Sequence, residues 1–165
     1  MVRKLVADCM LVLLLLGLVL APTIAGASSD AEKEVKRTVK LDREGRLRVD
    51  AYKGTIRISG WDRNEVQIHA RIVADPDVGR RYARESVDAT EIDIRDRGSS
   101  VTIVSDYDRV PSERRFLGFG TSKILPLVHY TIRAPRNARI TVEDHKSEIE
   151  FSNLSGSVYL DTHKG

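Results

Sequence analysis

The chain has 165 residues, with 27 basic and 24 acidic side chains and a formal net charge of +3 at pH 7. A hydrophobic fraction of 41% and a charged fraction of 31% are typical of a folded domain and exclude a disordered or low-complexity chain. The sequence holds only three Phe, five Tyr and one Trp, which favours a thin core of Ile, Val and Leu over a deep aromatic ligand pocket. So small a net charge neither requires nor excludes a polyanionic partner.

Residues 1–27 have the three parts of a secretory signal peptide. Arg3 and Lys4 form a basic start, Leu11–Ala21 is apolar, and Ala25–Ala27 is a small-x-small cleavage site. The apolar run is shorter than the ~20 residues that span a bilayer, which favours cleavage over a retained membrane anchor. We therefore expect an exported protein, located in the periplasm, at the cell surface or outside the cell. Export argues against a nucleic acid partner.

Cleavage after Ala27 removes Cys9, the only cysteine, so the mature chain has no disulfide. Residues 28–38 are polar and are expected to form a flexible lead-in. Residues 39–165 are expected to form one domain.

A repeat of about nine residues organises this domain. Pairs of apolar residues separated by one polar residue recur at Ile140/Val142, Ile149/Phe151 and Val158/Leu160. Both side chains of such a pair leave a strand on the same face. Further pairs occur at Leu47/Val49, Ile56/Ile58, Val66/Ile68, Ile92/Ile94 and Val101/Ile103, and small corner residues precede several of them. The pattern predicts an all-β, single-domain β-solenoid of stacked short strands.

Two features interrupt the strands. Asp75-Pro76 has the signature of a helix start, and apolar residues then recur at helical spacing, which predicts one short helical insertion over Pro76–Ala89. Trp61 follows Gly60 at a corner. It is expected to cap a strand pair, and the alternative is a sugar-stacking role.

Between Ser105 and Pro126 the alternation stops. This loop is the candidate interaction segment, because two basic side chains adjoin three apolar ones in it: Arg114, Arg115, Phe116, Leu117 and Phe119. One interpretation is an apolar tip for a partner or a lipid surface. The other is a lid over the open end of the core.

Residues capable of chemistry are few. His145 and His163 occupy equivalent corners eighteen residues apart, and stacking would bring them about one strand spacing from each other, ~4.8 Å. Two imidazoles without further ligands predict no metal site. Glu143 and Asp161 repeat in the same way, but nothing in the sequence gives them the unequal environments that paired catalytic carboxylates need. We expect no catalytic residue and no cofactor.

The segment Val128–Ile140, followed by the corners at Ser147, Gly156 and Gly165, resembles the bacterial "putative adhesin" domain family of unknown function. The family is itself similar to the head domains of autotransporter adhesins. Tyr52–Asp62 resembles the family's first rungs. The resemblance implies a β-solenoid at the bacterial envelope, and it carries over no binding residue.

The predicted function is therefore that of a non-enzymatic surface for adhesion or for interaction with an envelope protein or glycan. Sensing through a membrane signalling protein is a second possibility, and a polysaccharide-active enzyme is a third. Because the repeat calls for apolar residues beyond Gly165, we expect the domain to be incomplete at its C-terminal end, and its open edge to favour self-association.

Overall fold

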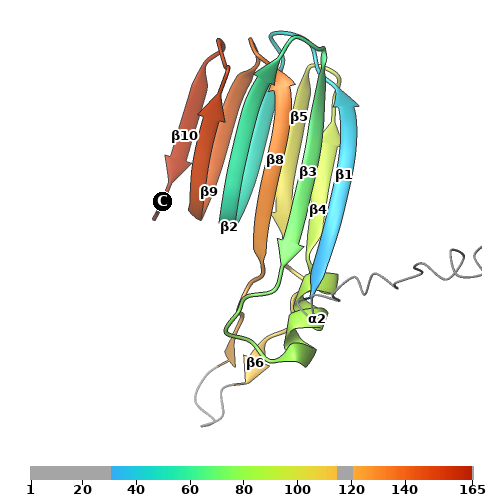
Figure 1. Cartoon of the computed structure of the whole chain (residues 1–165), viewed down its shortest axis with the longest axis vertical. Coiled ribbons are helices and arrows are strands. Elements are labelled where there is room, and N and C mark those ends of the chain that lie inside the picture. Colours follow the sequence, from blue (N-terminus) through green and yellow to red (C-terminus); the bar gives the residue numbers. More distant parts are fainter. Residues whose placement is uncertain (1–30, 115–120, 165) are drawn as a thin grey trace, which may run out of the picture.

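The computed structural model describes residues 31–114 and 121–164, which form strands and one short helix (Figure 1). The elements are β1 (Glu32–Lys40), β2 (Arg46–Trp61), β3 (Glu65–Val73), α2 (Arg80–Ala89), β4 (Glu91–Asp96), β5 (Ser100–Asp106), β6 (Glu113–Arg114), β7 (Thr121–Ser122), β8 (Leu127–Pro135), β9 (Arg139–Ser152) and β10 (Val158–Thr162). The prediction of an all-β domain with one short helix is confirmed, but residues 32–38 of the expected flexible lead-in belong to strand β1.

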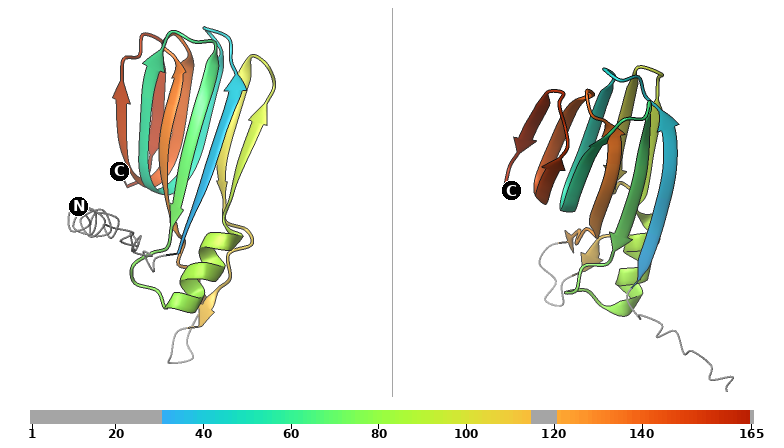
Figure 2. Two further views of the ribbon diagram at one scale, coloured as in Figure 1. Left: turned by 45° about the vertical axis from the view of Figure 1, so that its right-hand side comes forward. Right: turned by 45° about the horizontal axis from the view of Figure 1, so that its top comes forward.

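Strand β2 is the centre of the main sheet, whose order is β1-β3-β8-β2-β5-β4. Its first half, Arg46–Asp50, pairs with β5, and its second half, Gly54–Trp61, pairs with β8. Strand β9 pairs in parallel with both halves, and β10 then pairs with β9. The sheet therefore turns at β2 and curls into a nearly closed, barrel-like arrangement (Figure 2).

The sequence repeat corresponds to the stacking of β2, β9 and β10. Ile140 lies between Leu47 of β2 and Val158 of β10, and Val142 lies between Val49 and Leu160. The eighteen-residue step from Ile140 to Val158 thus equals one layer of parallel strands, whereas β2 and β9 are neighbours although Leu47 and Ile140 are 93 residues apart. Burial falls toward β10: Val49 and Val142 are 0% exposed, whereas Val158 is 40% and Leu160 is 42% exposed.

Elsewhere the chain departs from the predicted coil, and the mixed sheet does not establish a β-solenoid over the whole domain. Ile92/Ile94 and Val101/Ile103 do not stack in successive layers, because β4 and β5 form an antiparallel hairpin in which Ile94 faces Ile103. The tight turn at Gly98, with φ of 74°, can join only antiparallel neighbours, since parallel strands need a long crossover. Strand β3 is likewise antiparallel to both of its neighbours, β1 and β8.

The core between the curled walls consists mainly of branched aliphatic side chains. Its largest fully buried members are Tyr130, Leu41, Leu47, Ile56, Ile58, Ile68, Ile72, Ile103, Ile132, Ile140, Val49 and Val66. Tyr130 is the one aromatic residue in this group, and its hydroxyl lies 2.7 Å from the hydroxyl of Ser105. Alternating polar and apolar residues on each strand account for this division between a buried and a wet face.

Helix α2 lies beyond one end of the strands (Figure 1). It begins at Arg80, four residues later than the sequence predicts, and its N-cap residue Gly79 makes no side-chain capping bond. The carboxylate of Asp75 does not cap the helix, because it accepts hydrogen bonds from the backbone N–H of Asp77 and from the Lys53 ammonium. The apolar side of the helix is buried, and the hydroxyl of Tyr82 donates to the carbonyl of Pro111 at 2.8 Å.

Within the segment 105–126, β6 and β7 pair as a two-stranded antiparallel sheet. Of the candidate interaction loop, Arg115, Phe116, Leu117 and Phe119 lie outside the described residues, as does the side chain of Arg114. The lid and the apolar tip therefore both stay predictions. In the described part of the chain, no helix has the length and apolar character needed to cross a membrane.

Candidate functional site: the corner ladder

The contacts of Trp61 favour a structural role, capping the end of a strand pair, over an open platform on which a sugar could stack. The Trp61 indole N–H donates to the carbonyl of Glu65 at 2.8 Å. The Arg63 guanidinium lies 5.0 Å from the ring centroid, and that of Arg133 lies 6.0 Å from it. These contacts occupy groups that a stacked sugar would use, and they favour the packing role for Trp61.

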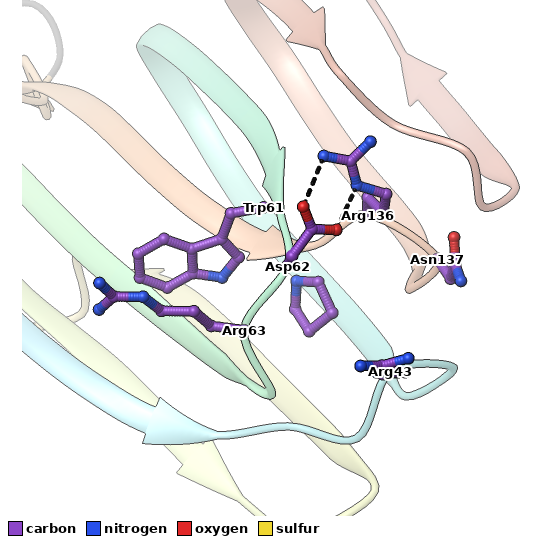
Figure 3. Close-up of a pocket in the computed structure, with 7 residues that line it drawn as sticks. Arg43, Trp61, Asp62, Arg63, Arg136 and Asn137 are labelled. Carbon is purple, nitrogen blue, oxygen red and sulfur yellow. Dashed lines mark hydrogen bonds and ion pairs between the residues drawn. The ribbon is translucent and has the colours of Figure 1, made fainter.

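Figure 3 shows how the cleft of about 180 Å³ beside Trp61 is closed on one side. Arg136 binds Asp62 through two hydrogen bonds, with Nε to Oδ1 at 2.7 Å and Nη2 to Oδ2 at 3.0 Å. The side chains of Arg43 and Asn137 line the rest of the cleft. The Asp62–Arg136 pair joins the corner after β2 to the corner after β8, so its role in the fold is sufficient to explain it.

A second surface lies at the other end of the second half of β2, where the chain turns from one wall to the other. Strand β2 makes this corner at Ala51–Gly54, and β9 makes it at Asp144–Ser147. Gly54 has φ of 138°, which only glycine adopts without strain. In the β9 corner the Asp144 carboxylate accepts hydrogen bonds from the backbone N–H and the hydroxyl of Ser147, both at 2.6 Å.

Three aromatic rings stack where these corners lie one above another. The rings of Tyr52 and His145 have centroids 4.7 Å apart and are tilted by only 9°. His145 and His163 stack in turn at 5.5 Å and 27°. Tyr107 packs edge-on against Tyr52 at 6.3 Å, and burial raises the pKa of the Tyr107 hydroxyl to about 12, so that it stays neutral. The predicted stacking of the two histidines is thus present in the structure.

A lysine follows each stacked ring, at Lys53, Lys146 and Lys164. We call these six residues, Tyr52, Lys53, His145, Lys146, His163 and Lys164, the corner ladder. Together with Lys123, Ile124 and Leu125, all but His163 line a groove of about 290 Å³. The side chain of Lys123 also donates to the carbonyl of Asp108 at 3.1 Å, which holds it beside the groove.

Positive charge in this groove is only partly neutralised. Lys53 pairs with Asp75, which is buried. Burial alone would raise the pKa of Asp75, but the hydrogen bonds from Lys53 and Asp77 and the charges of Lys53 and Lys146 lower it below its usual range. In the described part of the chain, no ion pair involves Lys146, Lys164 or Lys123. All three are exposed.

The basic side chains on the outer faces of the sheet are different, because many of them have a carboxylate partner on a neighbouring strand. Such pairs include Arg57–Glu150 at 3.2 Å and Arg71–Glu32 at 3.6 Å. Arg48 of β2 likewise forms an ion pair with Glu143 of β9, so the Glu143 carboxylate already has a cationic partner. Exposed pairs of this kind contribute little to stability, but they leave less net charge for a ligand.

The described residues include no group of three or more His, Cys, Asp or Glu side chains placed to hold a metal ion. The two histidines were predicted from the sequence, whereas Tyr52 and Lys53 were missed. A signal for these was present, since Tyr52-Lys53-Gly54 precedes Ile56 as His145-Lys146-Ser147 precedes Ile149.

No protein-family model and no curated protein matches the chain. Among solved structures, it is similar to a "putative cell adhesion protein" from Clostridium sporogenes, with 12% identity, a TM-score of 0.46, and coverage of 79% of this chain and 56% of that one. A "putative lipid binding protein" from Parabacteroides distasonis has 7% identity, a TM-score of 0.34, and coverage of 69% and 40%. A "putative adhesin" from Parabacteroides merdae has 11% identity, a TM-score of 0.33, and coverage of 79% and 52%.

The chain spans about half the length of these proteins, between 40% and 56%. At such identities and TM-scores, the similarities assign it neither a family nor a function.

Proposed function

We propose that this chain is an exported, non-enzymatic domain of the bacterial envelope, of the "putative adhesin" type, and that the corner ladder is its adhesive surface. In this proposal β2, β9 and β10 form a short solenoid stack that repeats the same corner chemistry in each layer. The observation that supports it is the stack of three rings, two of which line one groove together with the three lysines that follow the rings. A repeated surface of this kind suits an extended ligand better than a small substrate.

The chemistry of the groove favours binding over catalysis. General acid and base groups act in pairs whose environments separate their pKa values. The corner ladder instead repeats the same kinds of group in each layer, a ring followed by a lysine. The acidic side chains beside it are already engaged, Asp75 by Lys53 and Asp144 by Ser147. Exposed ammonium groups in an open groove attract anions from solution.

The test is retention of the exported protein on envelopes isolated from the source bacterium. A Lys146→Gln/Lys164→Gln variant removes two charges from the groove, and Lys40→Gln on β1 is the matched control at an exposed lysine far from it. We expect the wild type and the control to be retained and the double variant to be released at lower ionic strength. Equal retention of all three proteins, or no retention of any, would contradict the proposal.

A further inference from the structure

The corner ladder contains two parallel rows of different chemistry. One row is the ring stack, with successive centroids 4.7 and 5.5 Å apart. The other consists of Lys53, Lys146 and Lys164, one for each layer of the stack. Successive layers lie about one strand spacing apart, ~4.8 Å. A ligand that lies along the stack therefore meets a ring in each layer and an exposed ammonium group at Lys146 and Lys164, whereas the ammonium group of Lys53 is held by Asp75.

The ring row offers hydrogen bonds rather than stacking surfaces. His145 has Tyr52 on one face and His163 on the other, so its faces are not available to a ligand ring. The ring edges carry the remaining polar atoms. A phenol hydroxyl both donates and accepts hydrogen bonds, and an imidazole ring carries at least one N–H donor. Sugar hydroxyls match such groups, whereas a phosphodiester only accepts.

We infer that the corner ladder binds a linear, carboxylated polysaccharide laid along the stack. Carboxylates pair with the lysine row, and the sugar hydroxyls between them bond to the ring row. This inference rests on the proposed function, because it names the ligand of the same surface. Nucleic acid fits the site less well, because bases stack on free ring faces and both faces of the central ring, His145, are covered.

The test is calorimetric titration of the exported protein with oligogalacturonate, and with a neutral glucan and inorganic polyphosphate of similar length as comparison probes. We expect binding of oligogalacturonate, binding of polyphosphate at least ~10-fold weaker, and none of the glucan. Raising the ionic strength from about 0.01 M to about 1 M shortens the Debye length from ~30 to ~3 Å and should abolish the binding. Polyphosphate binding as tight as that of oligogalacturonate would overturn the inference.

Variants separate the two rows. Each lysine lost from the row, as in Lys146→Gln or Lys164→Gln, should weaken binding by roughly 2- to 5-fold, the range of exposed charge pairs. His145→Phe retains a flat ring for the stack but removes both ring nitrogens. This variant should bind oligogalacturonate roughly 2- to 10-fold more weakly. Lys40→Gln should have no effect. An unchanged affinity in His145→Phe would contradict the role of the ring row.

The two proposals fail differently. If retention on envelopes depends on Lys146 and Lys164 but oligogalacturonate does not bind, this inference is wrong and the proposed function stands. If neither is observed, both are wrong.

Discussion

Valine-to-alanine substitutions through the stack test whether β2, β9 and β10 form successive layers of one core. Val49 and Val142 are register partners in β2 and β9 and are fully buried, whereas Val158 in β10 is 40% exposed. Each substitution removes two methyl groups, worth about 1.6 kcal/mol of transfer free energy when fully buried. The cavity left in a packed core increases the cost to about 2–3 kcal/mol at Val49 and Val142.

At Val158 only roughly six-tenths of the transfer term applies, and no closed cavity forms, so the expected cost is about 1 kcal/mol. Glu148→Ala on the exposed face of β9 is the control and should cost less than about 0.5 kcal/mol. Urea denaturation of the four variants measures these free energies of unfolding. A cost at Val158 equal to that at Val142, or a control as costly as either, would refute the assignment of layers.

Four further predictions concern processing, the corner, acid stability and the β10 edge. Mass spectrometry of the exported protein should find Ser28 as its first residue, and an intact N-terminus would contradict cleavage. Gly54→Ala should cost at least about 2 kcal/mol in thermal unfolding, because φ is 138° there and a Cβ would meet the carbonyl of Val128. The lowered pKa of Asp75 stabilises the folded protein above its unfolded pKa of about 3.9, and this contribution is lost as the pH falls through the folded pKa. In Asp75→Asn the free energy of unfolding should therefore fall less steeply with decreasing pH below about pH 4. A slope equal to that of the wild type would contradict this. Light scattering should detect self-association that grows with concentration and that Leu160→Lys removes, since Leu160 is 42% exposed on β10. A monomer at every concentration would contradict it.

Local rules predicted the strands and their faces well. The alternation in β2 and β9 marks the side chains that the structure buries, such as Leu47 and Ile140, because one face of a strand packs on the core. The stacking of His145 on His163 followed from the same eighteen-residue period. Equal spacing along the sequence is enough to predict this contact, because β9 and β10 are parallel neighbours and their corners lie one above the other.

Strand pairing beyond the repeat could not be predicted, because nine-residue spacing fits a hairpin as well as a coil. The pairs Ile92/Ile94 and Val101/Ile103 have the right spacing, and yet the short turn at Gly98 makes β4 and β5 antiparallel. The insertion of β8 between β2 and β3 joins segments about 70 residues apart in the sequence, as in the Ile56–Tyr130 pair, and no local pattern records such a contact. For the same reason the proximity of Lys123 to the corner ladder became visible only in the folded chain.

The most direct test of the corner ladder is a ligand titration in which NMR follows the imidazole signals of the four histidines. Two of them, His145 and His163, belong to the ladder. The other two, His69 and His129, lie on β3 and β8, outside the groove, and serve as internal controls. Adding oligogalacturonate to the protein should shift the imidazole signals of His145 and His163 together and leave the other two unchanged. Shifts confined to His69 and His129, or no shift at any histidine, would contradict the corner ladder as the binding surface.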